Sequence, residues 1–162
     1  MGVAEEFLTL AVRLSQPAST DPEQACLRRA VSTAHYALFH LLAQEGVQVW
    51  NGSPSARLGL ERVFEHRRMK EVSLLLSKGH WRGWSAPRLP VPSELKEVAQ
   101  TFIDLQDARH RADYDNAKTW TPVEVSAQVE AVQIAFDSWR QIRSSPAAGE
   151  YLLSLLIGKK RE

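Results

Sequence analysis

The 162-residue sequence has a single cysteine, Cys26, so it has no disulfide framework within the chain, and this composition is typical of a reducing cytosol. It also lacks any run near the roughly 20 apolar residues that a membrane-spanning helix needs. The first residues have neither the basic start nor the apolar run of a secretory signal. We therefore expect a soluble, cytoplasmic protein with no membrane contact.

A bias of charge is missing too. Lysine and arginine number 20 against 19 aspartate and glutamate, so no overall field draws the chain to nucleic acid, and any electrostatic site must be local. The five histidines do not show the spacing of metal ligands, and no glycine-rich phosphate loop is present. We expect no metal and no cofactor.

Apolar residues recur at helical spacing in almost every long segment, and no run alternates as a strand does. The sequence therefore predicts an all-α fold: an up-and-down bundle of four to five main helices plus a short C-terminal helix. We expect one domain over 1–162, with its core at about 5–143 and a C-terminal helix with a basic tail at 144–162. In the first helix, the predicted apolar stripe includes Phe7, Leu8, Leu10, Ala11 and Leu14.

Capping and breaking residues set the predicted boundaries. The first helix covers about 3–15. The second begins at Thr20 or Asp21 and ends at Gly46, and its core face is Ala30, Ala34, Ala37, Leu38 and Leu41. A helical pattern follows over 55–78, with a break near His66, and 79–92 reads as a loop. Ser93 caps the next helix, Thr121-Pro122 starts one that ends near Arg143, and Ser145-Pro146 opens the last.

Two segments combine Arg, His and Tyr in an unusual density for helices that also carry core residues. Residues 28–40 read Arg-Arg-Ala-Val-Ser-Thr-Ala-His-Tyr-Ala-Leu-Phe-His, and residues 109–115 read Arg-His-Arg-Ala-Asp-Tyr-Asp. On a helix, Arg29, Tyr36 and His40 share one side because they are spaced by seven and four residues. These segments are the predicted place for chemistry.

As a pair, the two motifs resemble the HEPN superfamily (higher eukaryotes and prokaryotes nucleotide-binding domain), over roughly residues 5–143. The resemblance implies a helical bundle that forms a homodimer, with the motif ends of the two subunits facing each other across a cleft. Many members are metal-independent ribonucleases, and several are toxins of toxin–antitoxin or phage-defence systems. It also implies an active motif in which an Arg precedes a His by four to six residues.

At the position of that His this sequence has Tyr114, so it diverges from the motif. Tyr has an ordinary pKa of about 10 and is a poor base at neutral pH. His110 follows Arg109 directly, about 100° around the helix. The candidate catalytic residues are therefore Arg109, Tyr114 and His40, with His40 able to replace the missing His if its side of the helix faces Arg109. A structural His40, with one ring nitrogen bonded to a carbonyl, is the alternative.

The candidate RNA or nucleotide contacts come from the same motifs and from the loop. Guanidinium groups bind phosphate, and aromatic rings stack on bases. The motif candidates are Arg28, Arg29, Tyr36, Arg111, Asp113 and Asp115. In the structural alternative, Asp113 or Asp115 pairs with Arg28 or Arg29, and Tyr114 fills a gap.

Two further basic groups lie between the motifs: His66, Arg67, Arg68 and Lys70, and then Lys78, His80, Trp81, Arg82, Trp84 and Arg88. Cations interleaved with aromatic rings are typical of single-stranded nucleic-acid sites, and Lys78, Trp81 and Arg82 are candidate contacts. The alternative is a solvated helical turn and a loop held to the core by its tryptophans.

We predict from these features a HEPN-like protein that binds RNA or a nucleotide at the motif helix end, with a toxin- or defence-type ribonuclease activity left open. The alternative function is a non-catalytic interaction module that binds a cognate protein partner. The exposure of Arg109 and Tyr114 in a shared cleft would favour the first.

Overall fold

The computed structural model describes residues 2–16, 23–49, 52–81 and 89–157. This part of the chain is all-α and contains no strand, so the predicted fold class is confirmed. Its helices are α1 (Val3–Ser15), α2 (Gln24–Gln48), α3 (Pro54–Glu61), α4 (His66–Ser77), α5 (Ser93–Tyr114), α6 (Pro122–Ile142) and α7 (Pro146–Ile157). None of the helices in the described ranges is long and apolar enough to cross a membrane.

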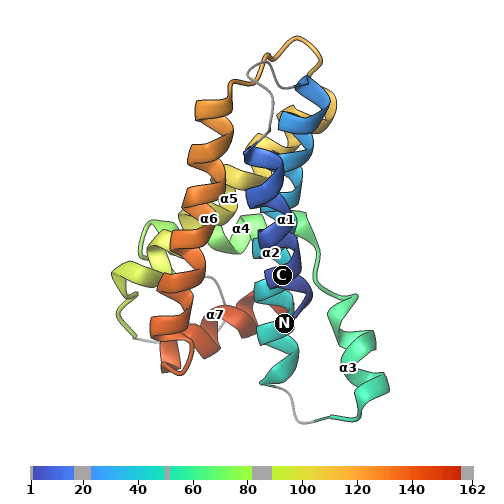
Figure 1. Ribbon diagram of the computed structural model, residues 1–162. Coiled ribbons are helices and arrows are strands. Elements are labelled where there is room, and N and C mark those ends of the chain that lie inside the picture. Colours follow the sequence, from blue (N-terminus) through green and yellow to red (C-terminus); the bar gives the residue numbers. More distant parts are fainter. Residues whose placement is uncertain (1, 17–22, 50–51, 82–88, 158–162) are drawn as a thin grey trace.

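The long helices α1, α2, α5 and α6 form the body of the bundle (Figure 1). α2 packs against α1, α5 and α6, while α4 packs on α5. α7 runs across one end and contacts α2 and α4, and α3 packs on α2 at the margin of the bundle (Figure 1). This arrangement brings the middle of α2, the start of α4 and the C-terminal half of α5 together.

α2 is the central helix, because it is buried on more than one side. Six consecutive residues, 30–35, are all buried. Six residues make more than one full turn, so this part of α2 has no side that faces solvent. The predicted core face of α2 is buried throughout and is confirmed. Its alanines let the neighbouring helices approach closely, and the polar residues of this segment are consequently held inside the bundle.

The predicted end of α2 at Gly46 is wrong, since the helix continues to Gln48. A Cβ atom at Gly46 would lie 2.5 Å from Cζ of Phe64. Phe64 is buried and lies in the short non-helical segment between α3 and α4. Gly46 therefore makes room for an aromatic ring, and it does not terminate the helix. The predicted start at Thr20 or Asp21 lies outside the described residues. Within them, α2 begins at Gln24 with Glu23 as its N-cap.

Most other boundaries follow the sequence signals. The break near His66 is confirmed, with α4 beginning at that residue. Thr121 and Glu124 form a capping box at the start of α6. Two details differ: Pro92, and not Ser93, is the cap residue of α5, and Leu10 of the predicted α1 stripe is 41% exposed. The basic tail and most of the predicted loop, 82–88, lie outside the described residues.

Candidate functional site

The candidate site lies where α2, the first residue of α4 and the C-terminal half of α5 meet. We call it the Arg109 site and define it by the polar side chains of these helices: Ser32, His35, Tyr36, His40, His66, Arg109 and Asp113. α2 supplies the first four, which follow one another at helical spacing.

Arg109 is the cation of this site, and its side chain is 18% exposed. Its Nη1 donates to Oη of Tyr36 and to Oδ2 of Asp113, both at 3.5 Å, the outer limit of a hydrogen bond. Its Cζ lies 5.8 Å from the centroid of the Tyr36 ring. Its Nε is buried and makes no hydrogen bond within the described part of the chain. The guanidinium is thus positioned by its neighbours but weakly satisfied.

Asp113 offsets the charge of Arg109 only in part. It lies one helical turn after Arg109 and accepts a hydrogen bond of 2.5 Å from Oγ of Ser32. The carboxylate is therefore shared between α2 and α5, with its shorter contact to the serine. The structural alternative in which Asp113 pairs with Arg28 or Arg29 is not what the structure shows for this residue.

Two histidines meet beside Tyr36. Nε2 of His35 and Nδ1 of His66 are 2.8 Å apart, so an N–H of one ring donates a hydrogen bond to the nitrogen of the other. His35 is fully buried, and its ring contacts Phe102. The partly exposed His66 ring is stacked on Phe39, with ring centroids 4.0 Å apart, and meets Tyr36 edge-on at 6.0 Å. Both imidazoles are held in fixed orientations.

Burial makes these two histidines neutral at physiological pH. Desolvation, with smaller effects of His66, Arg109 and His40, lowers the pKa of His35 to about 2. Desolvation, followed by the charges of Arg109 and His40, lowers the pKa of His66 to about 4. A proton on either ring would add a positive charge next to the guanidinium in a partly desolvated place. Arg109 is therefore the one fixed cation among the residues that define the site.

His40 lies one turn further along α2 and is stacked on Phe7 of α1, with ring centroids 5.1 Å apart and planes 4° from parallel. Its Nδ1 is buried and has no hydrogen-bond partner within the described ranges, so the predicted carbonyl partner is not found for that nitrogen. Burial lowers its pKa, while the carboxylate of Glu61 acts in the opposite direction. His40 acts electrostatically on His35 and His66, but its ring packs on α1 and no contact with Arg109 is found in the described chain, so its candidate role stays a prediction.

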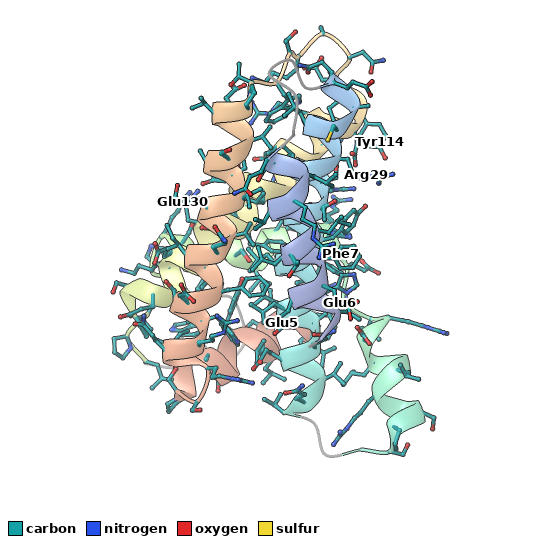
Figure 2. All side chains as sticks on the ribbon, viewed as in Figure 1. Glu5, Glu6, Phe7, Arg29, Tyr114 and Glu130 are labelled. Atoms are coloured by element: carbon teal, nitrogen blue, oxygen red, sulfur yellow. The ribbon has the colours of Figure 1, made fainter. Side chains whose placement is uncertain are left out.

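Tyr114 does not join this group. It is 68% exposed and lies about 140° around α5 from Arg109, with its ring beside His110. Figure 2 shows the Tyr114 and Arg29 side chains on the outside of the bundle, and Arg29 is exposed as well. Tyr114 and Arg109 therefore do not share a cleft within one chain, so the arrangement that would favour nucleotide binding over the interaction module is not found for this pair.

Arg28 has a different environment from Arg109. Its guanidinium donates to three backbone carbonyls, of Ala112 and Asp115 at 2.9 Å each and of Lys118 at 2.6 Å. The last carbonyls of a helix have no partner within the helix, and Arg28 satisfies them where α5 ends. The Asp115 carboxylate accepts from the amide of Ala117 at 3.1 Å. Arg28 and Asp115, both candidate RNA contacts, therefore stabilise the turn that follows α5.

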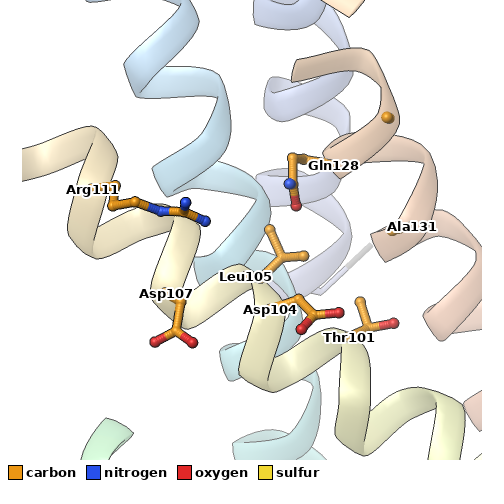
Figure 3. Close-up of a pocket in the computed structure, with 8 residues that line it drawn as sticks. Thr101, Asp104, Leu105, Asp107, Arg111, Gln128 and Ala131 are labelled. Carbon is orange, nitrogen blue, oxygen red and sulfur yellow. The ribbon is translucent and has the colours of Figure 1, made fainter. Parts of the chain in front are cut away.

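Arg111 points to the opposite side of α5, where a pocket of about 400 Å³ lies between α5 and α6 (Figure 3). The pocket is lined by Thr101, Asp104, Leu105, Asp107, Arg111, Ala127, Gln128 and Ala131. One of its carboxylates, Asp107, already pairs with Lys70 at 2.5 Å. Arg111 is thus separated from the Arg109 site by the body of the helix.

The candidate contacts of the loop differ in their surroundings. Nε1 of Trp81 donates to the carbonyl of Leu89 at 2.8 Å, and its ring packs on the core, as in the structural alternative. Lys78 is exposed at the end of α4. Arg82, Trp84 and Arg88 lie outside the described residues. The described part of the loop therefore adds no residue to the Arg109 site.

Sequence reasoning assigned no role in the site to His35 or His66, although both belong to it. The polar segment 65–70 indicated a helix break but not what its first histidine would contact. The available signal was the spacing of Ser32, His35 and Phe39, which places a histidine on the same buried face as a serine and an aromatic ring.

Among the described residues, no group of three or more His, Cys, Asp or Glu side chains is arranged to hold a metal ion. No family model, no curated protein and no solved structure matches this chain. The functional conclusion is therefore drawn from the contacts of the Arg109 site and from the motifs that supply its residues.

Proposed function

We propose that this chain is a HEPN-like protein that binds RNA or a nucleotide through a phosphate group at the Arg109 site. The observation that carries the proposal is the weak satisfaction of Arg109. Its guanidinium is largely buried, its two contacts are both 3.5 Å long, and its Nε has no partner in the described chain. Phosphate oxygens are strong acceptors for a guanidinium with unused N–H groups.

The rings around Arg109 support the same ligand class. Tyr36, Phe39 and His66 are partly exposed, and the His66 ring contacts each of the other two. Flat rings next to a cation can stack on a base while the cation holds the phosphate. Tyr36 touches both Arg109 and His66, so a base and a phosphate of one nucleotide can be reached from the same place.

Binding is tested with a fluorescently labelled single-stranded RNA and its anisotropy, comparing Arg109→Gln with Arg111→Gln. We expect Arg109→Gln to weaken binding about tenfold or more, because hydrogen bonds to a charged group contribute about 1.5–3 kcal/mol. Arg111→Gln removes the same charge from the other side of α5 and should change the dissociation constant less than about threefold. Equal losses in the two variants would contradict a site at Arg109.

Metal-independent cleavage of RNA is a second candidate function, favoured by two imidazoles near Arg109. His35 and His66 are hydrogen-bonded to each other, and the charge of Arg109 acts on both rings. The test is incubation of the purified protein with total RNA in EDTA. We expect cleavage that is lost in a folded Arg109→Ala variant. If neither the wild type nor Arg109→Ala cleaves the RNA, the nuclease hypothesis is wrong and binding remains the proposed function.

The homodimer stays a prediction of the resemblance, and light scattering on the purified protein measures it directly. The non-catalytic interaction module also stays open as the alternative function. It is the conclusion to draw if the wild-type protein neither binds nor cleaves RNA.

A further inference from the structure

The protons of the His35–His66 pair can be assigned from burial. Nδ1 of His35 is buried and has no partner in the described chain. A proton there would be an unsatisfied buried N–H group, which costs more than an unused acceptor in the same place. The proton of His35 is therefore on Nε2, and this N–H donates a hydrogen bond of 2.8 Å to Nδ1 of His66. It follows that neutral His66 carries its own proton on Nε2.

We propose that His66 donates this Nε2–H to a phosphate oxygen of an RNA phosphodiester held by Arg109, and that His35 is a positioning residue that fixes the tautomer and orientation of His66. The inference rests on the proposed function and specifies its ligand contact. His66 is suited to the role because its ring is partly exposed at the edge of the site, stacked on Phe39 and in contact with Tyr36, which also contacts Arg109.

The charge of the site favours a phosphodiester over the phosphate of a free nucleotide. Arg109 contributes one positive charge, and Asp113 at 3.5 Å offsets part of it. His35 and His66 are neutral, so they add N–H groups without adding charge. A diester carries a single negative charge, while a terminal phosphate carries nearly two at pH 7. One partly offset cation and a neutral donor match the diester.

The groups that face His66 come from each neighbouring element. α2 supplies His35, Tyr36 and His40, α5 supplies Arg109, and Glu65 precedes His66 in the chain. Burial, followed by the charge of Arg109 and a smaller effect of His40, lowers the pKa of His66 to about 4, so His66 stays a neutral donor between pH 5.5 and 8.0. A charged imidazolium donor with an ordinary pKa of about 6.5 would lose strength across the same range.

The experiment measures binding of a labelled RNA oligonucleotide without terminal phosphates, at constant salt, from pH 5.5 to 8.0. A phosphodiester does not titrate in this range, so the profile reports the protein. We expect His66→Ala to weaken binding about tenfold, and the ratio of its dissociation constant to that of the wild type to be the same at every pH.

His66→Gln keeps an N–H donor near the place of Nε2 and should bind within about threefold of the wild type. His110→Ala, an exposed histidine on α5, is the matched control and should bind as the wild type does.

The positioning role is tested separately. His35→Ala should weaken binding severalfold, whereas His35→Gln, which keeps an N–H group for Nδ1 of His66, should restore most of the affinity. Thermal melts monitor the fold of both, and the two His66 variants test the proposal if His35→Ala does not fold. Unlabelled dinucleoside monophosphate should compete for the site at lower concentrations than adenosine monophosphate.

Three results would overturn the inference while RNA binding stands: wild-type affinity in His66→Ala, a His66→Ala ratio that falls toward one as the pH rises, or stronger competition by the nucleotide. Loss of binding in Arg109→Gln would accompany each of them if the proposed function is right. Absence of RNA binding by the wild-type protein would overturn the proposed function itself, and this inference with it.

Discussion

Arg28 and Arg109 come from the two motifs that the sequence singles out, yet their surroundings differ in one decisive respect. Arg28 makes three hydrogen bonds of 2.6–2.9 Å to backbone carbonyls. Arg109 makes two contacts of 3.5 Å and leaves its Nε without a partner in the described chain. An arginine whose donors are used by the fold stabilises the fold, whereas one whose donors are weakly used keeps N–H groups for the phosphate that we propose it binds.

The strongest way to break this comparison is to remove Arg28. Arg28→Gln should lower the free energy of unfolding by about 2–3 kcal/mol, because three carbonyls near the end of α5 lose a charged donor. Urea unfolding followed by circular dichroism measures the change. RNA affinity of the folded variant should stay near the wild-type value. A loss of affinity with unchanged stability would place Arg28 in the binding site instead.

The next largest effect is the pH dependence of stability, which comes from the neutral histidines His35 and His66. The pKa values of His35 and His66 are lowered in the folded protein to about 2 and about 4, below the value of about 6.5 in the unfolded chain. Between the folded and unfolded values, the unfolded chain binds more protons, so stability is fully present above pH 6.5 and falls as the pH decreases. Each histidine contributes a slope of up to about 1.4 kcal/mol per pH unit.

This dependence is measured by urea unfolding at a series of pH values from 7 to 5. His35→Gln should show a shallower decline than the wild type, because glutamine does not titrate. Parallel declines in the two proteins would mean that His35 is not the buried neutral group described above. His110→Gln, in which the removed histidine is exposed, should keep the wild-type slope.

The smallest effect sharpens the role of Asp113. Asp113→Asn removes the negative charge near Arg109 and keeps an acceptor for Oγ of Ser32. We expect RNA to bind about threefold more tightly, since the phosphate no longer faces a carboxylate. Anisotropy titration at moderate salt detects this change. Weaker binding would show that Asp113 is needed to orient Arg109 more than it competes with the ligand.

Much of the fold could be predicted because its signals are local. Thr121 with Glu124 caps α6 through contacts three residues apart, and the alanines of α2 mark a buried face by their spacing alone. Gly46 was misread for the opposite reason. Its role depends on Phe64, which follows α3 in the chain and meets α2 only through tertiary packing.

The site was predictable only in part for the same reason. The motifs indicated Arg109, Tyr36, His40 and Asp113, and the structure joins Arg109 directly to Tyr36 and Asp113. Periodicity could not show that Arg28 meets carbonyls 84–90 residues away, nor that the first residue of α4 meets His35. Such contacts depend on how helices cross, which the residues of one helix do not specify.

The most direct test of this account measures two quantities for Arg28→Gln and Arg109→Gln together: the free energy of unfolding and the dissociation constant for single-stranded RNA. We predict a crossed pattern, in which Arg28→Gln loses stability and keeps affinity, while Arg109→Gln changes stability by less than about 1 kcal/mol and loses affinity about tenfold. If Arg109→Gln keeps its affinity for RNA, the Arg109 site does not bind phosphate and the account is wrong.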